Sequence, residues 1–330
     1  MVEATGQDPG HGPGMTWGDL LAAIVDGEGT LTAVAWKLIE HAPGDDVASV
    51  ERALRRLRQR GHADGGVWGQ RLLRVFGVPA EAYARVRWMG LYHSPFGDLP
   101  RTLCLDQLRL WDRPPVSTSR ARVWLHLGQT SCALRQRALE DAGRELGRAA
   151  SALAGAQDQD DARVEHALAS AFLASQRGEA AAPELDRAAS ILEGARLTSA
   201  DDACFRARLV DQRAYQANRA GDHEGAMALY DSLPTTDVHP FASYRRDAGL
   251  AFGHLRAGRR EDARRLALAA CEQAGDGGYT RLRAMGLLIL ARASEPAEAA
   301  AAIARAAAIA ERLEDAELMA RIDRRRRASG

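Results

Sequence analysis

The stretch from Asn218 to Pro234 most constrains what this chain can fold into. Its small residue and its Gly221-Asp222 corner join two segments whose apolar residues recur with a helical period, one over about Asp201 to Ala220 and one over Ala226 to Leu233. Gly221 can adopt the left-handed conformation that ends a helix, and Asp222 can cap the helix that follows. Pro234 stops the second helix. The stretch therefore predicts two helices joined by a tight corner, and the same pattern recurs downstream.

The composition favours an all-α protein. Only 5% of the 330 residues are aromatic, whereas β-sandwiches and barrels are typically richer in aromatic and β-branched residues. Lys plus Arg equals Asp plus Glu, at 44 each, so the net charge does not indicate a nucleic-acid-seeking or membrane-seeking protein overall. The N-terminus has no signal-peptide pattern and the longest apolar stretches fall short of a membrane span, so we expect a cytoplasmic protein. Four scattered cysteines without CxxC spacing indicate buried free thiols: Cys104, Cys132, Cys204 and Cys271.

The Gly-Asp helix pair resembles a tetratricopeptide repeat. That family places small residues at its eighth and twentieth positions and an aromatic residue at the twenty-fourth, which fall here on Ala214, Ala226 and Tyr230. The small first-helix positions of successive units, at 128, 171, 214, 251 and about 287, are 43, 43, 37 and 36 residues apart. The resemblance implies an α-solenoid of about five tetratricopeptide-like helix pairs over residues 118–327. We expect its C-terminal capping helix over Glu311–Arg327.

The same resemblance implies a partner-binding groove, because ligands of this family commonly lie in the concave groove formed by the first helix of each pair. Carried over position by position, it points to Arg208, Asp211, Tyr215, Asn218, Arg219, Arg245, Phe252, Arg256, Arg281 and Arg292. An amide and several guanidiniums suit an acidic or C-terminal peptide, because Arg binds a carboxylate with two parallel hydrogen bonds. The alternative is that these are ordinary polar positions on a helix surface.

The N-terminal region divides into a disordered lead over residues 1–14 and a small helical domain over residues 15–78. Apolar periodicity predicts helices over Trp17–Val25, Leu31–His41 and Val47–Arg60. The third helix and the Gly-rich segment after it resemble the third helix and wing of a winged helix-turn-helix domain. The resemblance implies that Gly65-Gly66 turns the wing and that Gln70–Phe76 returns as a strand. In the alternative, Arg71–Phe76 is a helix and the wing is absent.

In the winged helix-turn-helix family the third helix enters the major groove of DNA. Over residues 51–90, nine arginines outnumber three acidic residues, which is the charge surplus expected of phosphate contacts. The residues that would face double-stranded DNA are Arg52, Arg55, Arg56 and Gln59. Many winged helices instead dock proteins, and an arginine-rich helix face can simply be solvated.

Residues 79–117 form an aromatic-rich helical connector before the array. The aromatic residues concentrated here are Tyr83, Trp88, Tyr92, Phe96 and Trp111. We interpret the segment as a packed hinge that seats the N-terminal domain on the first repeat. The alternative is an aromatic-lined pocket for a small molecule.

The sequence contains no catalytic, metal-binding or nucleotide-binding motif, so we expect no enzyme and no cofactor. The predicted function is a regulator whose array binds a protein or peptide and whose N-terminal domain binds DNA. The alternative is an interaction scaffold in which the N-terminal domain docks a protein or self-associates. A homo-oligomer is compatible with either function.

Overall fold

The computed structural model describes residues 14–41, 44–154, 158–234 and 239–327, and the secondary structure of these residues is entirely helical. All but one residue of the expected lead over residues 1–14 lie outside this range. The all-α prediction is confirmed for the described residues. The chain forms two compact units, the first comprising Met1–Arg87 with Asp106–Leu125 and the second Trp88–Leu105 with His126–Gly330. None of the described helices is both long and apolar enough to cross a membrane.

The connector predicted over residues 79–117 is shared between the two units. The helices that begin in the first unit are α1 (Trp17–Glu28), α2 (Leu31–Glu40), α3 (Val47–Arg58), α4 (Gly66–Phe76), α5 (Ala80–Gly90), η2 (Val116–Thr118, a 3-10 helix) and α7 (Arg122–Arg135). Those that begin in the second unit are η1 (Pro95–Asp98, a 3-10 helix), α6 (Arg101–Trp111), α8 (Leu139–Leu153), α9 (Asp160–Arg177), α10 (Ala182–Gly194), α11 (Ser199–Ala220), α12 (His223–Asp231), α13 (Pro240–Arg256), α14 (Arg260–Asp276), α15 (Thr280–Ala293), α16 (Pro296–Arg312) and α17 (Ala316–Arg327).

The first unit packs α1 to α4 around one apolar core that includes Trp17, Leu38, Leu54 and Leu72. The three predicted helices are α1, α2 and α3, and Asp46 caps α3 by accepting a hydrogen bond from the Ser49 amide. The Trp17 indole donates to the Ala63 carbonyl at 2.7 Å, which ties the chain after α3 to the core. The apolar stripes read from the sequence therefore form this core.

The wing strand expected over Gln70–Phe76 is wrong, and the helix alternative is confirmed, because these residues form the second part of α4. Gly65, one of the two glycines expected to turn the wing, packs against a ring instead, as does Gly69. A Cβ atom on Gly65 would lie 2.3 Å from the Trp17 ring, and one on Gly69 would lie 2.7 Å from it. Glycine is therefore required at both positions so that α4 can approach Trp17 closely.

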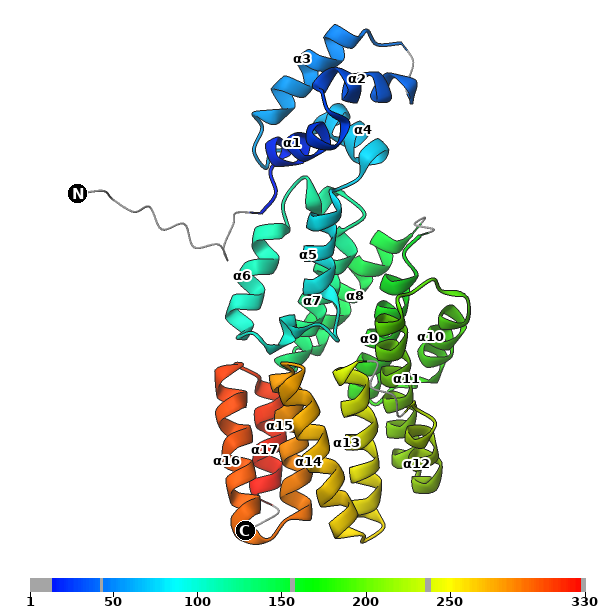
Figure 1. Ribbon diagram of the computed structural model, residues 1–330, viewed down its shortest axis with the longest axis vertical. Helices are drawn as coiled ribbons and strands as arrows, with labels where there is room; N and C mark the ends of the chain where they lie inside the picture. Colours follow the sequence, from blue (N-terminus) through cyan, green and yellow to red (C-terminus); the bar gives the residue numbers. More distant parts are fainter. Residues whose placement is uncertain (1–13, 42–43, 155–157, 235–238, 328–330) are drawn as a thin grey trace, which may run out of the picture. The chain divides into compact units, whose positions relative to one another are not determined.

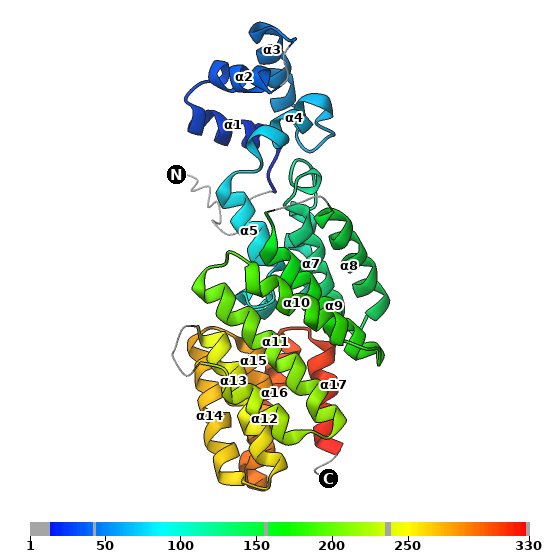
Figure 2. The same cartoon turned by 90° about the vertical axis from the view of Figure 1, so that its right-hand side faces the viewer.

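The second unit is an array of adjacent helix pairs, which is compatible with a helical repeat. The pairs are α7/α8, α9/α10, α11/α12, α13/α14 and α15/α16, followed by α17. Helices α13, α14, α15 and α16 pack consecutively side by side (Figure 1). Figure 2 shows the same array from a direction turned by 90°.

The Gly-Asp corner has the predicted geometry. Gly221 has φ 88° and ψ −1°, a left-handed conformation, and the Asp222 side chain accepts from the Gly225 amide at the start of α12. Ala214 and Ala226 are buried, as close packing of α11 and α12 requires. Tyr230 is buried and its hydroxyl donates to Asp211 at 2.9 Å. The sequence pattern therefore located this helix pair correctly.

The single capping helix expected over Glu311–Arg327 is divided. Helix α16 continues to Arg312, and α17 starts at Ala316. Between them Glu314 has a φ of 53°, a conformation that ends a helix, and Asp315 accepts from the Leu318 amide at the start of α17. The helix period continues through this corner without a glycine, so the sequence pattern did not reveal the break.

All four cysteines are free and buried, which confirms their predicted environment. Cys104 and Cys132 come together although 28 residues separate them, and a hydrogen bond with the Cys132 thiol lowers the pKa of the Cys104 thiol.

Candidate partner-binding face

The candidate site lies on the first helices of the pairs in the second unit. Helix α11 packs against α9 and α13, and α13 packs against α15. Arg208 on α11, Arg245 on α13 and Arg281 on α15 all contact one side chain, Tyr92. We call the side of these helices that carries the three arginines the first-helix face.

Tyr92 is held by charged groups. Its hydroxyl accepts from Arg245 Nη2 at 3.1 Å and from Arg281 Nη1 at 3.5 Å. The guanidinium carbon of Arg208 lies 4.5 Å from the centre of its ring, a cation–π contact. Burial alone would raise the pKa of Tyr92, but the charges of Arg245, Arg281 and Arg208 outweigh it and lower the pKa. We call Tyr92 and these three arginines the Tyr92 cluster.

Each arginine of the Tyr92 cluster also has a carboxylate partner on the helical array. Arg208 pairs with Glu165 of α9, and both side chains are almost fully buried. Arg245 Nη1 pairs with Asp211 at 2.7 Å, and Arg281 Nε pairs with Asp315 at 2.6 Å. Paired charges of this kind are tolerated inside a protein, whereas an isolated one is not.

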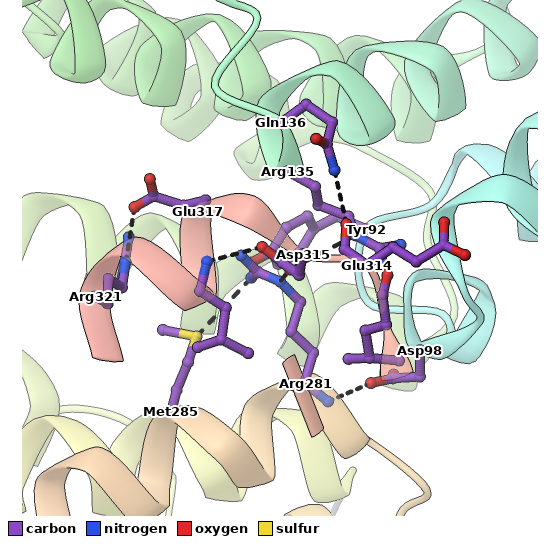
Figure 3. Close-up of polar contacts among 12 residues, drawn as sticks. Tyr92, Asp98, Arg135, Gln136, Arg281, Met285, Glu314, Asp315, Glu317 and Arg321 are labelled. Carbon is purple, nitrogen blue, oxygen red and sulfur yellow. Dashed lines mark hydrogen bonds and ion pairs between the residues drawn. The ribbon is translucent and has the colours of Figure 1, made fainter. Parts of the chain in front are cut away.

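Asp315 connects the last corner of the array to this cluster. Figure 3 shows its carboxylate between Arg135 and Arg281, and the Asp98 carboxylate directed toward Arg281. Burial alone would raise the pKa of Asp315, but the charge and hydrogen bond of Arg281 lower it. In contrast, burial raises the pKa of Asp98 to about 6, although its carboxylate accepts from the Arg281 backbone amide.

A second part of the same helices remains exposed, and we call it the open face. Its members are the exposed Tyr215, Arg219 and Arg256, the half-buried Phe252 and Arg292, and the half-buried Asn218. Tyr215 is 48% exposed, which is unusual for so large a side chain in this protein. The Arg219 guanidinium lies 6.0 Å from the Tyr215 ring centre, and that of Arg292 lies 5.1 Å from the Phe252 ring centre.

Contacts connect the residues of the open face across the helices. His223 contacts Asn218 Oδ1 at 2.9 Å through Nδ1, and Arg256 Nη2 lies 2.8 Å from His223 Nε2. Burial lowers the pKa of Arg292, and the nearby charges of Arg325 and Arg256 lower it further. Positive charges thus accumulate beside the exposed Tyr215 ring and the half-buried Phe252 ring, an arrangement that favours a negatively charged ligand.

The ten residues predicted to line the groove therefore separate into two groups. Arg208, Asp211, Arg245 and Arg281 are brought together around Tyr92 and paired within the chain. The other six form the open face. The sequence reasoning missed Tyr92, Glu165 and Asp315, because each lies far along the chain from the arginine it contacts.

The aromatic-rich segment contacts several helix pairs of the array, whereas a hinge on the first repeat would contact only the first pair. The side chains and backbone of Tyr92 and His93 contact α9, α11, α13 and the start of α15. A cavity lined by Tyr92, Phe96 and Arg135 has a volume of only about 10 Å³. It can hold no more than a water molecule, so it is not a small-molecule pocket.

Three of the predicted nucleic-acid residues lie on α3 in the first unit, and the fourth, Gln59, directly follows its last residue. Arg52, Arg55, Arg56 and Gln59 are all exposed. Arg55 pairs with Glu51 at 2.6 Å, and Arg52 donates to Ser49 Oγ at 2.8 Å. These are local contacts on one helix surface, and the side chains remain accessible to a ligand.

The chain matches no family model, no curated protein and no solved structure. Its function is therefore argued from its own residues.

Proposed function

We propose that the second unit binds an acidic protein or peptide segment at the open face, and that the chain acts as a regulator. One observation carries this proposal: the first-helix face holds a segment of the chain itself, the turn that includes Tyr92, through aromatic and arginine contacts. The open face offers the same kinds of groups, Tyr215 and Phe252 with Arg219, Arg256 and Arg292. These side chains are suited to bind carboxylates flanked by apolar residues.

The peptide class can be tested with a designed probe. A fluorescein-labelled octapeptide of alternating glutamate and leucine with a free carboxyl terminus should bind the protein, and binding should weaken as salt is added. The control is the same peptide with glutamine for glutamate and an amidated terminus. Equal anisotropy changes for both peptides would exclude recognition of negative charge.

We further propose that the first unit binds double-stranded DNA through α3, with Arg52, Arg55, Arg56 and Gln59 facing the duplex. The proposal relies on their exposure and on the local surplus of arginine, and it does not require a wing. Duplex affinity should fall steeply with salt and be lost when Arg52, Arg55 and Arg56 are changed to Glu. Charge reversal of the exposed Arg109 on α6 is the control, and absence of duplex binding at low salt would refute this part.

A scaffold function is the second candidate. Trp36 on α2 is 56% exposed and Val67 on α4 is 64% exposed, and exposed large apolar side chains favour docking of a protein. If the first unit self-associates through them, sedimentation should show a concentration-dependent oligomer that Trp36→Ser removes. A monomer at all concentrations would exclude self-association. Neither candidate function assigns a catalytic role.

A further inference from the structure

The segment Leu91–Asp98 occupies the first-helix face as a ligand would. The Tyr92 amide donates to Glu165 on α9 at 3.3 Å, and its hydroxyl accepts from Arg245 on α13 and Arg281 on α15. One residue therefore contacts three first helices through hydrogen bonds, and a fourth, α11, through the Arg208 cation–π contact.

His93 is the second anchor of this segment. Its Nε2 lies 3.1 Å from Asp201 Oδ1 on α11, and its carbonyl accepts from the Tyr279 hydroxyl at 2.9 Å. Its ring packs edge-on against Phe205 with 4.9 Å between ring centres. Burial lowers the pKa of His93, so the neutral ring is the form that fits here.

The array does not need this segment to neutralise its own charges. Arg208, Arg245 and Arg281 form ion pairs with Glu165, Asp211 and Asp315, and none of these carboxylates belongs to the segment. The segment also supports itself in part, because Ser94 Oγ donates to the Trp88 carbonyl and the Trp88 and Phe96 rings pack edge-on. Because these carboxylates lie on the array, departure of the segment would expose paired charges rather than isolated ones.

The chain on either side of the segment leads into the first unit. Helix α5 begins in that unit at Ala80 and ends at Gly90, just before Leu91. Helix α6 starts at Arg101, after Asp98, and ends in the same unit at Trp111. Leu91–Asp98 is therefore joined along the chain to residues of the first unit on both sides.

We propose that Leu91–Asp98 is an intrachain occupant of the first-helix face that an acidic peptide displaces. The half-buried Met285 and Leu288 lie between Arg281 and Arg292 on α15 at helical spacing, so a peptide on the open face can extend toward the Tyr92 cluster. A carboxylate is a stronger acceptor for two guanidiniums than a neutral phenol hydroxyl. The identity of the displacing ligand rests on the proposed peptide binding, whereas the separability of the segment does not.

Native-state hydrogen exchange on the unmodified protein tests separability without any ligand. The Tyr92 amide is expected to be protected from exchange, but to exchange at least about tenfold faster than amides in the middle of α13. The free energy of the opening that exposes it should depend only weakly on denaturant, because only the segment opens. Exchange with the same denaturant dependence as α13 would overturn the proposal, because the segment would then open only when the array unfolds. No protection at all would also overturn it, because the segment would not be held.

Competition is tested with Tyr92→Phe, which keeps the ring and removes the hydroxyl. The affinity for the glutamate–leucine octapeptide should increase by about tenfold, because the face is free for a larger fraction of the time. Unchanged or weaker binding would refute displacement. If the octapeptide binds neither protein, the proposed peptide class fails, and the exchange measurement still decides whether the segment is separable.

Discussion

The Tyr92 cluster and the open face lie on the same three helices but differ in how their arginines are satisfied. Helix α11 carries Arg208 and Tyr215, α13 carries Arg245 and Phe252, and α15 carries Arg281 and Arg292. The arginines of the Tyr92 cluster pair with buried or half-buried carboxylates. Arg292 instead stacks on Phe252 and lies near other cations. On each helix, therefore, some side chains already have a partner within the chain and others are open to a ligand, and helix position alone does not distinguish them.

The largest expected difference between the two surfaces concerns stability. Arg245→Met should lower the free energy of unfolding by about 3 kcal/mol, because Asp211 would lose its buried partner and Tyr92 a donor. Arg256→Met on the same helix should leave it within error of wild type, because Arg256 is exposed. Urea unfolding followed by circular dichroism measures both. Equal losses of free energy of unfolding for the two variants would show that the arginines of the two surfaces do not differ in their contribution to stability.

A smaller loss of free energy of unfolding is expected when Asp315, the carboxylate that Arg281 and Arg135 share, is substituted. Asp315→Asn should cost about 2 kcal/mol at pH 7, since both arginines would lose a negative partner. The folded protein holds the pKa of Asp315 below its usual value, so its contribution is present above pH 4 and is lost as the pH falls through the folded pKa. The wild-type advantage should therefore shrink below pH 4. A difference that is constant from pH 7 to pH 3 would contradict this ion-pair account.

Substitution of Asp98 should have the smallest effect on the free energy of unfolding, and it should stabilise the protein. Burial raises the pKa of Asp98 to about 6. Above that pH the carboxylate is ionised, and its burial lowers the free energy of unfolding. The penalty disappears as the pH falls from 6 toward the unfolded value near 4. Asp98→Asn keeps an oxygen acceptor for the Arg281 amide and should stabilise the protein by about 1 kcal/mol at pH 7.5, after allowance for partial exposure.

The gain from Asp98→Asn should vanish near pH 4, as measured by urea titrations at several pH values. Destabilisation at pH 7.5 would show that the Asp98 charge is favourable to the fold. In that case the interaction with the Arg281 amide would outweigh the burial of the carboxylate.

The helices were predictable wherever local patterns carried the information. The capping and helix-ending residues Asp222 and Gly221, and the small Ala214 and Ala226, act on neighbours close in sequence or in the adjacent helix. Tyr92 was not predictable, because its contacts with Arg208, Arg245 and Arg281 span more than a hundred residues and leave no period in the sequence. Gly65 suggested a wing because the actual reason for a glycine there, the close approach of the Trp17 ring, is also distant in sequence.

The candidate site was only partly predictable for the same reason. The resemblance to the tetratricopeptide repeat pointed to ten polar and aromatic positions on the first helices, but it did not separate those already paired from those exposed. Arg208 and Arg219 are both on α11, yet Arg208 is 5% exposed and paired with Glu165, whereas Arg219 is exposed. A substitution at Arg208 would therefore damage the array itself. Arg256 and Arg292 are the better probes of partner binding.

The most direct test is the affinity of the glutamate–leucine octapeptide for Arg256→Gln/Arg292→Gln, measured by fluorescence anisotropy beside wild type and Arg264→Gln/Arg265→Gln. Arg264 and Arg265 are exposed arginines of α14 that pair with Glu298 and Asp262 outside the open face. The account predicts affinity at least about tenfold weaker for the first variant, with unchanged helicity, and no change for the second. Equal affinities for all three proteins would show that the partner does not bind at the open face.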